Sequence, residues 1–418
     1  MDFLKKLVKK SLQEHKPTNE RQFFPLVFAN YGEEEILRAI EVLLSGKLTM
    51  GERVLEFEKK FAEYLDAPYA VMVNSGSSAN LLALSVASNK SRRYRLKEGD
   101  EVLIPAICWA TSFAPIVQLG LIPKLVDIDP HTLNISVEHL KKMITKNTKA
   151  IFNVHILGNC SDMEEISFEI NRNNLISFED ACESLGTTYN DKMLGTFSDF
   201  GTFSFYFSHH MTTIEGGMVV CKTLEDYDLL KCLRAHGWSR NLSNQTLYEK
   251  QNPEIDPRFL FVNLGYNLRP MEIQGAFGLE QLKKISSMNF QRKENVKKLK
   301  NVLTGHALWK NQLSFPESLR QVDPVWFGFP MFLHKIYISK RSKFQNYLLK
   351  NGIDSRPIIS GNYALQPVYK QYGNKVTINE LKGAQDIHER GIFVGCHTTS
   401  LSDEICLKFA DIVLSFLS

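Results

Sequence analysis

Short apolar segments alternate with stretches of helical periodicity along the first half of the chain. Apolar runs at 69–73 (YAVMV), 101–105 (EVLIP) and 122–129 (IPKLVDID) predict buried strands, and the stretches at 81–88 and 109–119 between them predict helices. Because short apolar strands alternate with helices, we expect a mostly parallel sheet that is covered on both faces.

The same alternation continues to residue 221. Further strands are predicted at 149–156, 175–180, 199–205 and 217–221, and a helix at 163–173 separates the first two of them. This series completes the predicted sheet of the larger part of the molecule.

The pattern changes in the second half of the chain. The polar stretch 239–258 predicts a loop or an insertion, and the segment 265–285 ends in an amphipathic helix that leads toward a second, smaller domain. We therefore predict an N-terminal helical extension over 1–25, a large domain over 26–285 and a small domain over 286–418.

Composition and charge exclude several classes of function. The 418 residues are 44% apolar and 23% charged, which is typical of a soluble globular protein. The net charge of +4 is too small to predict nucleic-acid or membrane binding, although it suits an anionic small substrate. No apolar run approaches the roughly 20 residues that span a membrane. The seven cysteines form no CxxC pair, so we expect reduced thiols in a cytoplasmic protein.

The N-terminus, MDFLKKLVKKSLQEHK, is basic and has apolar residues at helical spacing. It lacks the continuous apolar stretch and the cleavage site of a signal peptide. We expect a helix that packs on its own domain, and a helix on a membrane surface is the alternative.

A first motif lies between a predicted strand and a predicted helix. It is the small-residue turn 74–80 (NSGSSAN). Small residues let the backbone approach a ligand, and the free N–H groups and the dipole of a helix start favour a phosphate there. An ordinary helix cap has the same pattern, so this motif alone leaves both interpretations open.

A second motif ends a predicted strand. It is the segment 177–184 (SFEDACES). An acidic residue at the carboxyl edge of a parallel sheet faces the crevice in which such sheets bind ligands. A carboxylate there can pair with a protonated pyridine nitrogen, which makes the ring an electron sink. A helix-capping aspartate is the alternative.

A third motif carries two adjacent histidines, His209 and His210, in a polar turn within 202–218. Neighbouring histidines on a strand point to opposite faces, so they make a poor metal pair, and the chain contains no HExxH motif. We predict no metal site. Taken as a bare pair, the histidines suggest a turn without a chemical role.

The three motifs together resemble the DegT/DnrJ/EryC1/StrS family of nucleotide-sugar aminotransferases. The resemblance spans residues 25–415 and rests on five ordered blocks: 105–129, 153–159, 179–186, 203–218 and 265–278. It implies the type I (aspartate aminotransferase) fold, with a mostly parallel seven-stranded sheet and a smaller C-terminal α+β domain. It also implies pyridoxal 5′-phosphate (PLP) or pyridoxamine 5′-phosphate (PMP) as cofactor.

The family normally has a lysine at the position of His209, and that lysine forms a Schiff base with the cofactor. With a histidine at this position, the chain resembles one branch of the family, the nucleotide-sugar 3-dehydratases. An imidazole forms no stable Schiff base, so we expect a non-covalently held cofactor in its pyridoxamine form. We also expect His209 to move protons with an unperturbed pKa near neutral pH.

One type of these dehydratases carries an iron–sulfur cluster, which is held by cysteines in the loop after the histidine block. Residues 222–270 contain only Cys232, whereas a cluster needs about four thiolates. We therefore expect the cluster-free type.

The resemblance implies roles for particular residues. The implied cofactor contacts are Gly76, Ser77 and Ser204 at the phosphate, Trp109 stacked on the ring, Asp180 at the ring nitrogen, Glu183 at the ring hydroxyl and Asn267 at the phosphate of a neighbouring subunit. The last contact predicts a homodimer with shared active sites. The candidate substrate residues, for which a solvated surface position is an equal alternative, are His210, Arg234, His236 and Arg240. His155 is predicted either to lie near the ring or to be a buried structural histidine.

We thus predict a PMP-dependent 3-dehydratase that acts on a nucleotide-linked 4-keto-6-deoxy sugar, with L-glutamate regenerating PMP. The first alternative is a sugar aminotransferase with an atypical histidine, which would leave nitrogen in its product. The second is a catalytically silent relative with a regulatory or scaffold role. The residues do not distinguish the nucleotide or the stereochemistry of the sugar.

Overall fold

Seven strands form the central sheet of the computed structural model, which describes residues 2–14, 22–27, 30–49, 51–373 and 380–418. The strand order is β1-β11-β10-β7-β6-β2-β3. The bounds are β1 Tyr69–Val73, β2 Glu101–Pro105, β3 Ile122–Val126, β6 Thr148–Val154, β7 Ile176–Asp180, β10 Phe200–Ser204 and β11 Gly217–Cys221.

The sheet is mostly parallel, as the apolar pattern predicted. Strands β10, β7, β6, β2 and β3 run parallel to their neighbours, and only β11 runs antiparallel, to both β1 and β10. Each strand of the parallel part is largely buried, because helices cover both faces. The carboxyl ends of β6, β7 and β10 therefore meet at one edge of the sheet.

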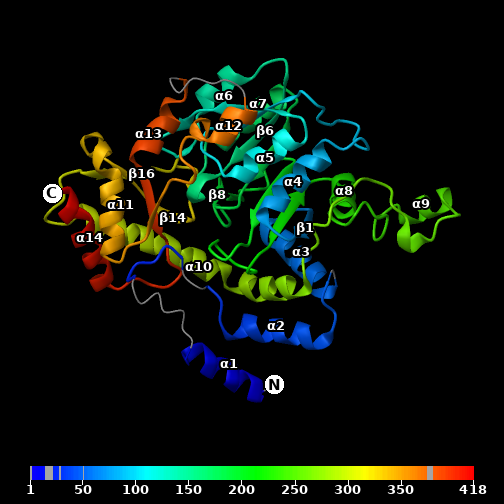
Figure 1. Cartoon of the computed structure of the whole chain (residues 1–418), viewed down its shortest axis with the longest axis horizontal. Coiled ribbons are helices and arrows are strands. Elements are labelled where there is room, and N and C mark those ends of the chain that lie inside the picture. The colour runs from blue at the N-terminus through cyan, green and yellow to red at the C-terminus, as the bar shows by residue number, and fades with distance from the viewer. Residues whose placement is uncertain (1, 15–21, 28–29, 50, 374–379) are drawn as a thin grey trace.

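Helices pack on the two faces of this sheet (Figure 1). The helices of the larger part are α3 Glu52–Leu65, α4 Gly76–Ala87, α5 Ala110–Gln118, α6 Val137–Met143, α7 Met163–Arg172 and α8 Leu224–Arg234. Helix α4 contacts β10 and β11, while α3 contacts β1 and α10 on the other side. The aromatic rings of Phe57, Phe61, Phe203 and Phe205 fill the space under α3 with T-shaped contacts at 5.2–5.9 Å.

Helix α10 (Glu272–Thr304) joins the large sheet to a smaller α+β unit and is 33 residues long. The predicted boundary at 285/286 falls inside this helix, so the domain bounds remain a prediction. The smaller unit contains a four-stranded sheet, β12-β14-β16-β15, and helices α11 and α14. Its elements are β12 Leu313–Ser314, β14 Gly328–Leu333, β15 Ser355–Pro357, β16 Gly391–Gly395, α11 Arg341–Lys350, α12 Pro367–Tyr372, α13 Lys382–Arg390 and α14 Asp403–Leu417.

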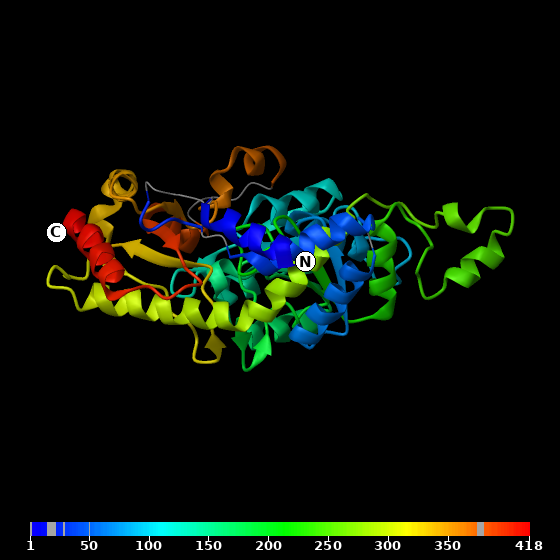
Figure 2. The same cartoon turned by 90° about the horizontal axis from the view of Figure 1, so that it is seen from below.

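Short elements complete the chain. They are β4 Ile128–Asp129, β5 Asn134–Ile135, β8 Thr188–Tyr189, β9 Lys192–Met193 and β13 Val322–Asp323. The predicted insertion at 239–258 contains helix α9 (Gln245–Gln251), and the surrounding arm projects from the body of the molecule (Figure 2).

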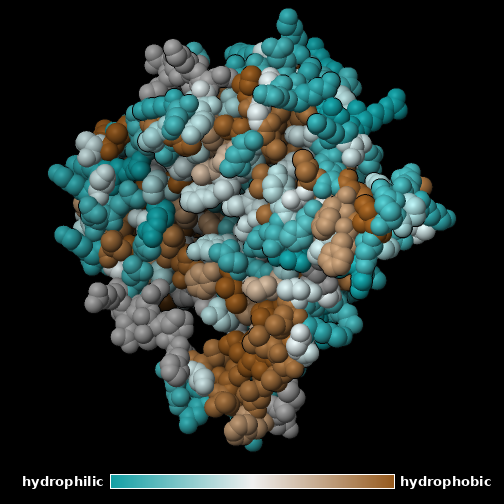
Figure 3. All heavy atoms as spheres, turned by 45° about the vertical axis from the view of Figure 1, so that its right-hand side comes forward, coloured by the Kyte–Doolittle hydropathy of each residue, from teal (hydrophilic) through white to brown (hydrophobic). Residues whose placement is uncertain are grey.

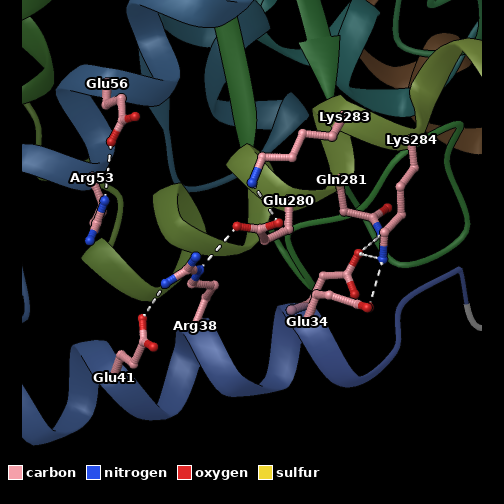
Figure 4. Close-up of polar contacts among 10 residues, drawn as sticks. Glu34, Arg38, Glu41, Arg53, Glu56, Glu280, Gln281, Lys283 and Lys284 are labelled. Carbon is pink, nitrogen blue, oxygen red and sulfur yellow. Dashed lines mark hydrogen bonds and ion pairs between the residues drawn. The ribbon is translucent and has the colours of Figure 1, made fainter. Parts of the chain in front are cut away.

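Of the two N-terminal helices, α2 lies against α10, and α1 packs on α2. Ion pairs fix α2 (Glu33–Ser45) to it: Arg38 contacts Glu280 at 3.0 Å, and Lys284 contacts Glu34 at 3.2 Å and the buried Glu35 at 2.8 Å (Figure 4). Helix α1 (Asp2–Glu14) packs on α2, which agrees with the expectation of a helix docked on its own domain.

Candidate active site

A cavity of about 760 Å³ lies at the carboxyl edge of the large sheet, where the small sheet faces it. Its lining includes residues that follow β6, β7 and β10, together with Arg356 and Phe393 from the small sheet. All three sequence motifs reach this cavity, through Gly76, Asp180 and His209. Open α/β sheets bind ligands at such an edge.

The first motif forms the start of α4. Ser75 caps the helix, and its Oγ accepts a hydrogen bond from the Ser78 N–H at 3.1 Å. The N–H groups of Gly76 and Ser77 lie in the first turn, where no intrahelical acceptor exists. A side chain at Gly76 would place its Cβ 2.5 Å from the Ser204 Cβ, so only glycine lets the turn close on Ser204. Helix start, glycine and serine hydroxyls together suit a phosphate.

The second motif places Asp180 at the end of β7, where it is 5% exposed. Its carboxylate accepts hydrogen bonds from Asn80 Nδ2 at 2.8 Å, Ser112 Oγ at 2.9 Å and the Cys182 N–H at 3.2 Å. These three donors fix the orientation of the carboxylate at the cavity wall. Asn80 is itself held by the Thr202 hydroxyl at 2.6 Å.

The third motif places His209 in the same cavity. Its Nδ1 lies 2.7 Å from the Cys182 carbonyl oxygen. A carbonyl only accepts, so Nδ1 carries the hydrogen and Nε2 is left as the acceptor of the ring. Burial lowers the pKa of His209 to about 4, and the nearby Arg292 adds to that effect. This differs from the unperturbed pKa that the sequence suggested, and it keeps the imidazole neutral and able to take a proton.

Glu183 also lines the cavity, and its pKa is shifted upward, whereas that of His209 is shifted downward. Burial raises its pKa to about 8, and the negative charge of Asp180 contributes in the same direction. Its Oε2 accepts a hydrogen bond from the Leu157 N–H at 2.9 Å. A carboxyl group that stays protonated at neutral pH can donate a hydrogen bond, which suits the predicted contact with a ring oxygen.

Replacing Glu183 with Gln is expected to stabilise the cofactor-free protein in alkaline solution. The raised pKa means that the folded protein keeps a proton that the unfolded chain releases near pH 4.5. The stabilisation from this proton is therefore complete below pH 4.5 and is lost as the pH rises through about 8. Glu183→Gln should melt about 2–4 °C above the parent at pH 8.5, and the gap should narrow toward pH 5. The exposed Glu404→Gln serves as control, and parallel melting profiles would contradict the raised pKa.

His155 is both buried and part of the cavity wall. Its Nε2 lies 2.9 Å from Glu179 Oε2, and Glu179 also accepts hydrogen bonds from the Gly195, Phe197 and Ser198 N–H groups. The other ring nitrogen, Nδ1, is buried without a partner among the described residues. A buried polar atom in a cavity wall fits a site that is completed by a ligand.

The remaining predicted residues divide into two groups. Trp109, Ser77 and Ser204 line the cavity, and Trp109 stays 60% exposed at the start of α5, which leaves its indole accessible to a ring. The predicted residues that do not line the cavity are His210, Arg234, His236, Arg240 and Asn267. Their predicted roles stay predictions.

Contacts elsewhere explain the positions of this second group. His210 is fully buried and bonds the Val325 carbonyl at 2.9 Å. Arg234 pairs with Glu58 at 2.6 Å. Arg240 lies 4.6 Å from the ring centre of Trp238, beside the projecting arm.

Three residues at or beside the cavity were not predicted from the sequence. Asn80, Ser112 and Arg292 contact the predicted residues or line the same wall. Asn80 closes the first motif, and its position one helical turn after Gly76 was the available signal.

The sequence profile of the DegT/DnrJ/EryC1/StrS aminotransferase family matches residues 29–410, and the chain belongs to this family. It is 39% identical over 384 residues to GDP-4-keto-6-deoxy-D-mannose 3-dehydratase of Yersinia pseudotuberculosis, covering 91% of this chain and 96% of that protein.

Two solved structures extend the likeness to the fold. The Escherichia coli GDP-4-keto-6-deoxy-D-mannose 3-dehydratase with bound hydrated PLP superposes with a TM-score of 0.87 at 38% identity, covering 94% of this chain and 99% of that one. A GDP-4-keto-6-deoxymannose 3-dehydratase with a trapped PLP–glutamate geminal diamine gives 0.85 at 37% identity, covering 93% and 100%. The predicted type I aminotransferase fold is thereby confirmed.

Among the helices that the structure describes, none is long and apolar enough to cross a membrane. The described His, Cys, Asp and Glu side chains also form no cluster of three or more that is suited to hold a metal ion.

Proposed function

We propose that this protein is a PMP-dependent 3-dehydratase that converts a nucleotide-linked 4-keto-6-deoxy sugar to the 4-keto-3,6-dideoxy sugar, with L-glutamate as the amino donor. The observation that carries the proposal is His209, which stands at the family's lysine position in a cavity that keeps a phosphate cradle and an oriented carboxylate. The relatives described above act, by their names, on a GDP-linked sugar, so GDP is the first nucleotide to test.

The residues of the cavity fit the cofactor. Gly76, Ser77 and Ser204 would hold its phosphate, and the carboxylate of Asp180 would pair with the ring nitrogen. The protonated Glu183 would donate to the ring oxygen, and Trp109 would cover a ring face. When bound, PMP supplies an amine that condenses with the C4 ketone and a ring that accepts an electron pair.

His209 moves the proton of the elimination step. Its neutral Nε2 would accept the proton from the C4′ carbon of the cofactor, and the resulting imidazolium would then donate it to the C3 hydroxyl of the sugar, which would leave as water. The Cys182 carbonyl, 2.7 Å from Nδ1, holds the ring in this tautomer and stabilises the charged form. The three hydrogen-bond donors to Asp180 hold its carboxylate in one orientation at the cavity wall.

The overall reaction balances without an external reductant. Glutamate supplies two hydrogens and is oxidised to 2-oxoglutarate, the sugar loses the C3 oxygen, and the nitrogen leaves as ammonia. The proposal includes no iron–sulfur cluster, which is supported by the single cysteine, Cys232, between residues 222 and 270.

The test is incubation of the protein with PLP, glutamate and a panel of GDP-, CDP-, dTDP- and UDP-linked 4-keto-6-deoxy sugars. Mass spectrometry should find one sugar that has lost its C3 oxygen and contains no added nitrogen. An amino sugar would instead support the alternative, an aminotransferase, which is the activity in the name of the family. No cofactor absorbance after incubation with PLP would support a silent relative.

We also propose a cytoplasmic homodimer with shared active sites. Asn267 lies outside the cavity of its own chain, and the arm beside it exposes Phe259, Phe261 and Leu264. Figure 3 shows a second apolar surface over α1 and α2, which includes the exposed Phe3, Leu7, Leu43 and Leu44. Exposed apolar patches of this kind mark contacts with partners, which supports a second copy of the chain.

Mixing two inactive variants tests the shared site. His209→Asn removes the proton carrier, and Asn267→Glu places a negative charge against the phosphate of the neighbouring cofactor. In a dimer with shared sites, one site of each mixed dimer is intact, so random re-association should restore about a quarter of the parent activity. Recovery should be absent when the two variants are mixed without dissociation. If the two variants form dimers but never complement, Asn267 does not act across the interface.

A further inference from the structure

Arg292, on α10, is a buried cation in the wall of the candidate active site. Arg292 lines the cavity and is only 3% exposed. Nη1 donates to three carbonyl oxygens, those of Trp326 at 3.3 Å, Phe327 at 3.1 Å and Cys396 at 2.9 Å. Nε is buried without an acceptor. Within the described ranges of the chain, no carboxylate lies at ion-pair distance from this guanidinium.

The other buried arginine of the described residues, Arg234, and the half-buried Arg92 each have a counter-ion. Arg234 pairs with Glu58 at 2.6 Å, and Arg92 pairs with Asp226 at 2.7 Å. Carbonyl dipoles satisfy one nitrogen of Arg292, but they do not neutralise its charge. An unpaired buried charge costs free energy, and burial accordingly lowers the pKa of Arg292. An anionic ligand in the cavity would supply the missing charge.

The position of Arg292 relative to the proton carrier narrows the kind of anion. Phe327 links the two residues: its carbonyl accepts from Arg292, and its ring centre lies 5.1 Å from that of His209. The phosphate cradle at Gly76 belongs to a different wall, formed by the start of α4. An anion at Arg292 therefore lies on the His209 side of the cavity, next to the reacting atoms.

We propose that Arg292 binds the α-carboxylate of the amino donor. This inference rests on the proposed function, which brings two anionic reactants to the cavity. In an amino acid, the carboxylate is bonded to the same carbon as the reacting nitrogen, so it lies beside the proton carrier. In a nucleotide sugar, the diphosphate is separated from the reacting C4 by the width of the sugar ring. A guanidinium also matches the planar geometry of a carboxylate.

The two half-reactions can be measured separately, because the proposed cofactor is not covalently held. In the first, PLP-loaded protein is mixed with glutamate and no sugar, and conversion to PMP is followed by the change in absorbance. In the second, PMP is added directly with the nucleotide sugar, and no glutamate is present. Arg292→Lys keeps the charge but removes the planar fork, and Arg292→Gln removes the charge.

We expect Arg292→Lys to raise the glutamate KM by about 10- to 100-fold and Arg292→Gln to raise it further. For Arg292→Lys, which keeps the positive charge beside His209, turnover with added PMP should fall by a much smaller factor than the glutamate KM rises, since a nucleotide sugar does not use this contact. A binding measurement supports the same point: 2-oxoglutarate should raise the melting temperature of the parent and not that of Arg292→Gln. Arg92→Lys, at a half-buried arginine that does not line the cavity, controls for general destabilisation.

Three outcomes would overturn the assignment. An unchanged glutamate KM in both variants would remove the carboxylate role. An equal loss in both half-reactions, with a lowered melting temperature, would make Arg292 a structural residue. A selective loss with the nucleotide sugar would assign it to the diphosphate. Because the first half-reaction contains no sugar, it remains informative even when the parent protein fails to dehydrate any sugar, and only the proposed function would then be lost.

Discussion

Replacing His209 with Asn is expected to lower the rate of C3 deoxygenation by about 10²- to 10⁴-fold. The variant loses Nε2, the ring acceptor left available by the hydrogen bond from Nδ1 to the Cys182 carbonyl. Asparagine keeps polar contacts in the cavity, so the affinity for PMP should stay within a few-fold of the parent. Rate is measured by mass spectrometry of the sugar, and affinity by titration of cofactor absorbance.

The same substitution at a second histidine shows whether the loss of rate is specific to His209. His306 pairs with Asp411 in the small unit, away from the cavity. His306→Asn should leave the rate unchanged. Near-normal turnover in His209→Asn would move the proton-transfer role to another group in the cavity.

Replacing Asp180 with Asn should have the second largest effect. Its carboxylate is held by Asn80, Ser112 and the Cys182 N–H, so it meets a charged ring nitrogen without reorganisation. The amide of asparagine carries no negative charge. Asn80 and Ser112 would then donate either toward its NH₂ group, which is itself a donor, or toward its oxygen, which is a weaker acceptor than a carboxylate. We expect both half-reactions to slow by about 10²- to 10³-fold and the cofactor to dissociate more readily.

The control for Asp180→Asn is Asp199→Asn. Asp199 lies near the other end of the same strands, where it accepts from the Ser177 N–H at 2.9 Å and does not line the cavity. Asp199→Asn should lower the melting temperature but change the rates of the two half-reactions little. If Asp180→Asn binds cofactor and turns over like the parent, the ring nitrogen is held by another group.

Much of the site could be predicted from the sequence, because its parts are short and local. A strand that runs into a small-residue turn, or one that ends in an acid, places its side chains at a known edge of a parallel sheet. Gly76, Asp180 and His209 meet in one cavity for that reason. The family resemblance then supplied the role of each residue, which spacing alone left open.

Other parts depend on long-range packing and could not be read from local patterns. Arg292 is one of many charged residues on α10, and only the approach of the Phe327 and Cys396 carbonyls reveals it as a buried cation. The lowered pKa of His209 likewise comes from burial by distant segments. The continuation of α10 to Thr304 reflects its contacts with α2, α3 and α14, which a window ending at 285 did not include.

The most direct test of the central claim is the fate of nitrogen in a reaction with GDP-4-keto-6-deoxymannose, PLP and ¹⁵N-labelled glutamate. We predict that the label appears in free ammonia and that the sugar product lacks both the C3 oxygen and the label. A sugar that retains the C3 oxygen and carries ¹⁵N at C4 would contradict the account and make the protein an aminotransferase.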